Sequence, residues 1–107
     1  MSPRLPLALA TVLLLAGCGG SEQSATVDIK SFKYEPATVH VRAGGQVTFT
    51  NGDKGGHTAT FTAGPSKLDT DRLERGDRAK LTFPKAGRYA YVCAFHAFMK
   101  GEVVVDD

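Results

Sequence analysis

The sequence predicts an all-β fold, a Greek-key β-sandwich of seven to eight strands, from three observations. Apolar and polar residues alternate in short runs that recur along the chain, as in half-buried strands. Clusters rich in glycine, proline, asparagine and aspartate separate these runs, as turns do. The chain has 107 residues, of which 42% are hydrophobic, so it suits one compact domain. Many short strands separated by turns are typical of a sandwich.

Each expected strand is marked by a pair of apolar residues two positions apart. In chain order these pairs lie at residues 27–29, 39–41, 47–49, 59–61, 81–83, 89–91 and 103–105. Turn signals fall between them at residues 35–36, 43–45, 51–53, 55–56, 64–65, 75–77 and 84–87. Residues 66–78 are the least strand-like, and we expect a short helix or an irregular crossover there, with its mixed charges facing solvent.

The N-terminus predicts export from the cytoplasm. Residues 5–16 are apolar and follow the positive end formed by Met1 and Arg4, and the stretch is too short to span a bilayer. The sequence Leu-Ala-Gly-Cys that follows, ending at Cys18, resembles the lipobox of bacterial lipoproteins. In that class the cysteine is lipidated and anchors the protein to a membrane surface. The alternative is an ordinary secretory signal followed by an incidental cysteine.

Three segments follow from this interpretation. Residues 1–17 are the expected lipoprotein signal peptide, and residues 18–25 are small and polar enough to form a flexible tether. The folded domain is expected at residues 26–107. A cell-envelope lipoprotein, anchored to a bacterial membrane, is therefore the predicted form of the protein.

Charge and cysteine content narrow the chemistry further. The formal net charge is only +2, so the chain lacks the strongly basic composition of a nucleic-acid-binding protein. We separately expect a monomer. If lipid modifies Cys18, then Cys93 has no partner left for a disulfide. A solitary thiol in an oxidising compartment is a liability unless it is buried or bound to a metal, so Cys93 is a candidate ligand.

The C-terminal part of the chain carries a candidate metal site. Cys93, His96 and Met99 recur at intervals of three between two expected strands, and His57 opens another expected strand upstream. Taken singly, each could be a core or surface residue. Together they form a thiolate, two imidazoles and a thioether, a set that copper favours and that zinc, iron–sulfur clusters and calcium do not.

These residues also resemble those of a known family. The motif YxYxCxxHxxMxGxVxV at residues 89–105, with GxxVxFxNxD at residues 44–53 and His57 after it, is similar to the cupredoxins, or plastocyanin/azurin family, and within them to the amicyanins. The resemblance implies a type I copper site, with His57, Cys93 and His96 as strong equatorial ligands and Met99 as a weak axial one.

The resemblance extends to the surroundings of the ligands. It implies that Asn51 hydrogen-bonds between ligand-bearing loops, although an Asn-Gly turn explains the same residue. Many family members have proline or glycine just before the loop histidine, and amicyanins tend to have proline just after it. Phe95 and Ala97 stand there in this chain.

The resulting hypothesis is a one-electron carrier, not an enzyme, with one copper ion cycling between Cu(I) and Cu(II). Apolar residues around His96 would let redox partner proteins dock there briefly. A copper chaperone, scavenger or sensor with the same ligands is the alternative. A thiol enzyme with Cys93 as nucleophile also fits a cysteine and a histidine, but it leaves Met99 without a role.

Overall fold

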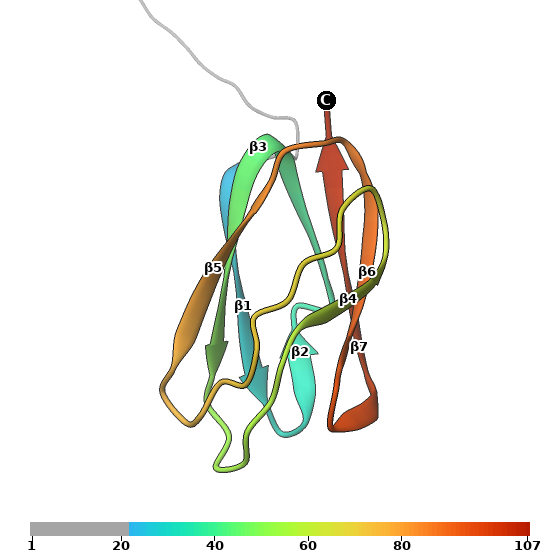
Figure 1. The fold of residues 1–107 in the computed structure, drawn as a ribbon. Coiled ribbons are helices and arrows are strands. Elements are labelled where there is room, and N and C mark those ends of the chain that lie inside the picture. Colours follow the sequence, from blue (N-terminus) through green and yellow to red (C-terminus); the bar gives the residue numbers. More distant parts are fainter. Residues whose placement is uncertain (1–21) are drawn as a thin grey trace, which may run out of the picture.

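In a computed structural model that describes residues 22–107, the chain forms the predicted β-sandwich (Figure 1). In this part of the chain, no helix is long and apolar enough to cross a membrane. The predicted signal peptide, the predicted lipidation site Cys18 and the first part of the predicted tether lie outside the described residues. The seven strands within residues 22–107 are β1 (Glu22–Lys30), β2 (Lys33–Glu35), β3 (Thr38–Asn51), β4 (Thr60–Ala63), β5 (Arg78–Phe83), β6 (Gly87–Cys93) and β7 (His96–Asp106).

The strands form one hydrogen-bonded sheet that folds into the two layers of the sandwich, and β3 runs through both layers. Its first half, up to Arg42, pairs in parallel with β7, which continues through β6 to β4. Its second half, from Gly45, lies between β5 and β1, and β1 pairs with β2. Gly44, with a φ of 86°, lies between the two halves, where a residue with a side chain would be strained. The two strands predicted at residues 39–41 and 47–49 are therefore halves of one long strand that contributes to both sheets.

The alternation read from the sequence points the same side chains into the core. All but one of the predicted pairs are buried on both members, the exception being Leu81, which is partly buried against the core. The core includes the aromatic residues Tyr34, Phe49, Phe61, Phe83, Tyr89 and Tyr91. A dense aromatic core of this kind contributes both buried area and edge-to-face ring contacts.

Two strand boundaries differ from the prediction at the start of the domain. Strand β1 begins at Glu22, so the predicted tether overlaps it over residues 22–25, whose backbone pairs with β3. Strand β2 was not expected, because the turn before it, Ser31-Phe32, lacks the Asn-Gly or Asp-Gly signal of a tight hairpin. Residues 66–77 contain no helix and cross the edge of the sandwich, with isolated bridges to His57 and Thr60, and β5 begins at Arg78.

One end of the sandwich gathers the segments that carry the predicted ligands. The β1–β2 turn, the loop after β3 and the turn between β6 and β7 all lie at the end opposite the C-terminus, which is the lower end in Figure 1. These segments are far apart in sequence, and the sandwich topology brings them together. The predicted site is therefore at one pole of the domain.

Candidate metal centre

The fold brings His57, Cys93 and His96 together. Their donor atoms all lie within 4.8 Å of one another. Cys93 Sγ is 3.7 Å from His57 Nδ1 and 3.6 Å from His96 Nδ1. His57 and Cys93 are buried and His96 is partly exposed, so only one of the three reaches the surface.

This spacing fits a shared metal ion. Bonds of about 2.3 Å to a thiolate sulfur and about 2.0 Å to an imidazole nitrogen, with about 120° between them, separate the two donors by about 3.7 Å. The two observed sulfur–nitrogen distances are 3.7 and 3.6 Å. A trigonal set of one thiolate and two imidazoles is the arrangement of a blue-copper site.

His57 reaches the site from an isolated bridge rather than from a regular strand. Its backbone exchanges hydrogen bonds with Leu73, donating at 3.1 Å and accepting at 2.8 Å, and β4 begins only at Thr60. The expectation that His57 opens a strand is therefore wrong by three residues. The crossover that carries Leu73 pairs with this segment in place of a strand and fixes the ligand backbone.

A carboxylate holds the ring of His57 from the other side. His57 Nε2 lies 2.9 Å from Asp53 Oδ2. Asp53 thereby favours the tautomer with its proton on Nε2. In this tautomer the lone pair of Nδ1 faces Cys93 and is free to bind a metal. Asp53 ends the motif at residues 44–53, but the sequence assigned it no role, and the structure makes it part of the site.

Asp53 also holds the β1–β2 turn. Its Oδ1 accepts the backbone N–H of Ser31 at 2.7 Å, and its Oδ2 accepts that of Phe32 at 2.9 Å. Partial burial of the carboxyl raises its pKa, but the N–H groups of Phe32 and Ser31 and the nearby His57 outweigh burial. The pKa of Asp53 is therefore lower than usual, and the carboxylate is ionised at neutral pH.

Cys93 and His96 face each other across a tight hairpin. The two residues are paired at the end of β6 and the start of β7, so only Ala94 and Phe95 form the turn. The three donors were expected in a loop between two strands. This expectation is wrong, because β6 extends to Cys93 and β7 already begins at His96. In the same hairpin, the backbone of Gly101 pairs with Tyr91. A Cβ at residue 101 would lie 2.3 Å from the tyrosine ring, so a residue with a side chain would clash there.

An irregularity in this hairpin brings Met99 into the interior. The pairing shifts between Val92, opposite Lys100, and Cys93, opposite His96, so residues 97–99 fall between the two pairs on β7. Bulges of this kind redirect side chains next to functional sites. Met99 is buried, three residues after His96, whereas its neighbour Phe98 is exposed.

Thr58 joins the two ligand-bearing segments. Its N–H donates to Cys93 Sγ at 3.4 Å, and its Oγ1 accepts the N–H of Ala94 at 2.8 Å. The Thr58 carbonyl accepts a hydrogen bond from the Tyr34 hydroxyl. Burial, with contributions from Cys93 and Tyr91, raises the pKa of Tyr34 far above its usual value, so this hydroxyl remains a donor.

Asn51 is fully buried and organises the loop before His57. Its Nδ2 donates to the carbonyls of Gly55 and Leu73, each at 2.8 Å, and its Oδ1 accepts the N–H of Asp53 at 2.9 Å. The last bond is the local turn contact expected of Asn-Gly, and the bond to Leu73 connects two segments. The direct link to the cysteine hairpin is made by Thr58.

Exposed aromatic rings cover the end of the site. Phe95 is 51% and Phe98 69% exposed, on either side of His96 in the sequence. Phe32, which the sequence did not indicate, is 45% exposed and joins them from the β1–β2 turn. The Arg72 guanidinium lies 5.1 Å from the centre of the Phe95 ring and adds a positive charge at the edge of this surface.

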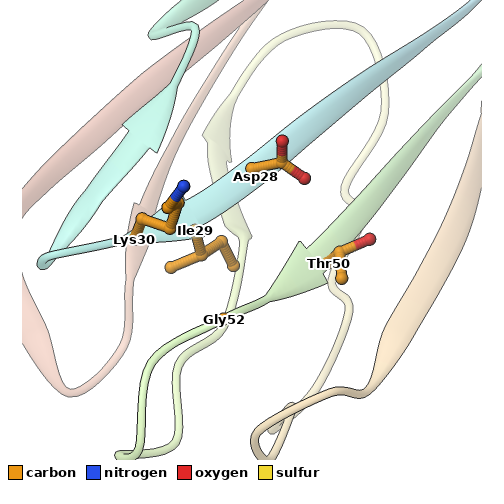
Figure 2. Close-up of a pocket in the computed structure, with 5 residues that line it drawn as sticks. All are labelled: Asp28, Ile29, Lys30, Thr50 and Gly52. Carbon is orange, nitrogen blue, oxygen red and sulfur yellow. The ribbon is translucent and has the colours of Figure 1, made fainter.

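Two other features lie away from the metal donors. His40 is exposed on β3, and its ring lies 3.9 Å from Asp106. A surface groove between the ends of β1 and β3 is lined by Asp28, Ile29, Lys30, Thr50 and Gly52 (Figure 2). None of these lining residues is among the predicted ligands.

The sandwich and its donor set define a copper-binding β-sandwich protein, and sequence comparison supports this class. Residues 21–106 match the family of copper binding proteins described as the plastocyanin/azurin family. The chain is 39% identical over 83 residues to amicyanin of Paracoccus denitrificans, covering 75% of this chain and 63% of that protein. It is 33% identical over 105 residues to amicyanin-alpha of Methylorubrum extorquens, covering 91% and 88% of the two. The chain belongs to the plastocyanin/azurin family.

Solved structures agree with this assignment. A reduced amicyanin variant superposes with a TM-score of 0.70 at 37% identity, over 78% of this chain and 82% of that one. A copper-containing nitrite reductase from Thermus scotoductus gives a TM-score of 0.74 at 30% identity, but only 22% of that longer chain is covered. The same fold therefore occurs both as a small protein and as part of an enzyme.

Proposed function

We propose that this protein is a one-electron carrier with a mononuclear type I copper site. His57, Cys93 and His96 would hold the ion as strong ligands and Met99 as a weak axial one. The observation that carries the proposal is the cluster of one thiolate and two imidazoles, spaced to share one ion. A bound copper ion would supply the Cu(I)/Cu(II) couple, and no substrate bond would be made or broken.

The residues of this chain would keep the ligands in one arrangement in both oxidation states. Asp53 holds the ring of His57, and Thr58 holds the Cys93 hairpin through two hydrogen bonds. Asn51 holds the loop between them. Ligands that are fixed in advance need little rearrangement when an electron arrives, and hydrogen bonds around the sulfur influence the potential.

The exposed end of the site supports docking of redox partner proteins near His96. His96 is the one partly exposed member of the donor cluster, and it lies among Phe32, Phe95 and Phe98. A small apolar surface suits the brief, low-area contacts of electron-transfer complexes. The relatives named amicyanin are consistent with a small carrier rather than an enzyme.

The optical spectrum of the copper-loaded protein tests this function. We expect the intense blue thiolate-to-copper absorption of a type I site, and Cys93→Ser should abolish it. A colourless or weakly coloured Cu(II) form would refute the proposal. If copper instead passes readily to an acceptor apoprotein while electron exchange is slow, the alternative of a copper chaperone, scavenger or sensor gains support.

We also propose that lipid on Cys18 anchors the protein to a bacterial membrane outside the cytoplasm. The proposal is supported by the apolar segment and the Leu-Ala-Gly-Cys sequence alone. Cys18→Ser should move the protein from the membrane fraction to the soluble fraction without changing the copper spectrum. Wild-type protein in the soluble fraction would contradict the anchor.

A further inference from the structure

The β1–β2 turn places Phe32 against both histidines of the site. The centre of its ring lies 5.2 Å from that of His57 and 5.0 Å from that of His96, with interplanar angles of 79° and 90°. The two histidine rings are 5.1 Å apart. The three rings therefore form a closed triangle, and the phenylalanine meets both imidazoles edge to face, a favourable arrangement for aromatic pairs.

Phe32 adopts this position at a conformational cost. Ser31 and Phe32 have φ angles of 53° and 60°, in the left-handed region that bulky residues rarely adopt. The backbone N–H groups of Ser31 and Phe32 both donate to the carboxylate of Asp53, which is also hydrogen-bonded to the ring of His57. Strained backbone persists where its surroundings hold it, and such positions concentrate at functional sites.

Core packing does not account for this residue. Phe32 remains 45% exposed, so a large part of its ring gains nothing from burial. A glycine at this position would accept the positive φ without strain. The ring of Phe32 contacts the pair of imidazoles and, at a longer distance of 6.3 Å between ring centres, Phe98. The two shorter contacts to the imidazoles explain the strained phenylalanine.

The two histidines are held by different means. His57 is fully buried and has the Asp53 carboxylate at Nε2. The hydrogen-bond contact of the His96 side chain within residues 22–107 is the 3.6 Å approach of Nδ1 to Cys93 Sγ. The orientation of the His96 ring therefore depends on neighbouring rings. Phe98, whose ring also contacts that of His96, is farther away at 5.9 Å and is 69% exposed.

We propose that Phe32 is a positioning residue of the metal site: its ring, held by Asp53 through the β1–β2 turn, keeps the exposed ligand His96 in its metal-binding orientation. This inference rests on the proposed copper site. It assigns the β1–β2 turn, which carries none of the ligands, a part in retaining the metal.

Copper release from Phe32→Ala tests the proposal, with Phe98→Ala as a matched control that removes another exposed ring in contact with His96. Each copper-loaded full-length protein is reduced and mixed with excess Cu(I) chelator, and release is followed by the absorbance of the chelate. We expect Phe32→Ala to release copper roughly tenfold faster than wild type, the order expected from losing two ring contacts. Phe98→Ala should stay within about twofold, since it loses the longer contact to one histidine.

Phe32→Gly separates positioning from a general effect on stability. Without metal, this variant should be at least as stable as Phe32→Ala in urea unfolding, because glycine accepts the positive φ. It should nevertheless release copper as fast as Phe32→Ala. The positioning role would be overturned if the copper release rates of the variants simply followed their metal-free stabilities. It would also be overturned if Phe98→Ala accelerated copper release as much as Phe32→Ala does.

The same samples distinguish this inference from the proposed function. If wild type shows the blue absorption and all variants release copper at its rate, only the positioning role of Phe32 fails. If wild type itself shows no blue absorption or holds no copper, the copper site fails and the inference fails with it.

Discussion

The substitution Asp53→Asn tests how the buried ligand His57 is held in its metal-binding orientation. The carboxylate accepts three hydrogen bonds, from Ser31, Phe32 and His57. An asparagine in the same position keeps one oxygen acceptor and places an N–H₂ donor where the other oxygen stood. That donor would oppose the N–H of Phe32 and favour the His57 tautomer with its proton on Nδ1, the atom that faces Cys93.

Two separate losses are expected. A hydrogen bond to a charged group contributes about 1.5–3 kcal/mol, so losing two of the three should lower the unfolding free energy of the metal-free protein by about 3–6 kcal/mol. Residues that orient a ligand histidine typically contribute 10–100-fold to metal affinity, so copper should bind roughly that much more weakly. Phe32 should also become mobile, because its turn loses an acceptor.

The stability loss should depend on pH in a defined direction. The pKa of Asp53 is lowered in the folded state. Its contribution is therefore complete above the ordinary pKa of an unfolded aspartate, about 3.9, and disappears as the pH falls through the lower folded-state value. The difference in unfolding free energy between wild type and Asp53→Asn should be constant near neutral pH and shrink in acid.

Urea unfolding followed by far-UV circular dichroism measures the stability of the metal-free protein, and competition with a chelator of known affinity measures copper binding. Asp77→Asn is a matched control, because Asp77 is exposed and accepts a backbone N–H from Glu74 without contacting a ligand. It should leave copper affinity unchanged. Wild-type copper affinity in Asp53→Asn would refute the reasoning that the carboxylate sets the His57 tautomer.

Three further predictions concern other residues of the site and core. Met99→Leu should keep the coloured copper site and raise its reduction potential, measured by redox titration, because a lost thioether destabilises Cu(II) more than Cu(I); complete loss of copper would show that Met99 is more than a weak ligand. Tyr91→Phe should stabilise the metal-free protein by about 1 kcal/mol in urea unfolding, because the buried Tyr91 hydroxyl has no hydrogen-bond partner among residues 22–107. Destabilisation by Tyr91→Phe would reveal a partner for that hydroxyl. Thr58→Val should broaden or shift the blue absorption, because the hairpin loses the Oγ1 bond to Ala94; an unchanged spectrum and potential would mean that the hairpin holds itself.

Most of the fold was predictable because one face of each sheet is buried. Alternation at pairs such as Val27 and Ile29 has only one solution when the apolar face must leave water, so it identified the core. The β1–β2 hairpin escaped prediction because Ser31 and Phe32 carry no local turn signal. Their positive φ angles are stabilised by the distant Asp53, and such tertiary support leaves no trace in the neighbouring sequence.

The site was predictable in its donors and, apart from Asn51, not in the residues that support them. The spacing of Cys93, His96 and Met99 is short and specific, and the fold does bring His57 to the first two. Asp53 and Thr58 are common residue types in a polar loop. The bonds of Asp53 form only when the loop meets the β1–β2 turn and the ring of His57, and those of Thr58 only when its segment packs against the β6–β7 hairpin. The extent of β7 was missed because its irregular pairing breaks the alternation that marks a strand.

The hairpin between Cys93 and His96 shows how a ligand segment can be held without stiff residues of its own. Phe95 and Ala97 do not restrict the backbone as proline would, so the rigidity of this segment must come from its contacts. Thr58 donates to the sulfur and accepts from Ala94, which ties the turn to the backbone segment that begins with His57. Because the two ligand segments are joined to each other, a displacement of either one moves both. The spacing between the thiolate and the first imidazole is thereby fixed by the sandwich, and the remaining freedom lies in the ring of His96.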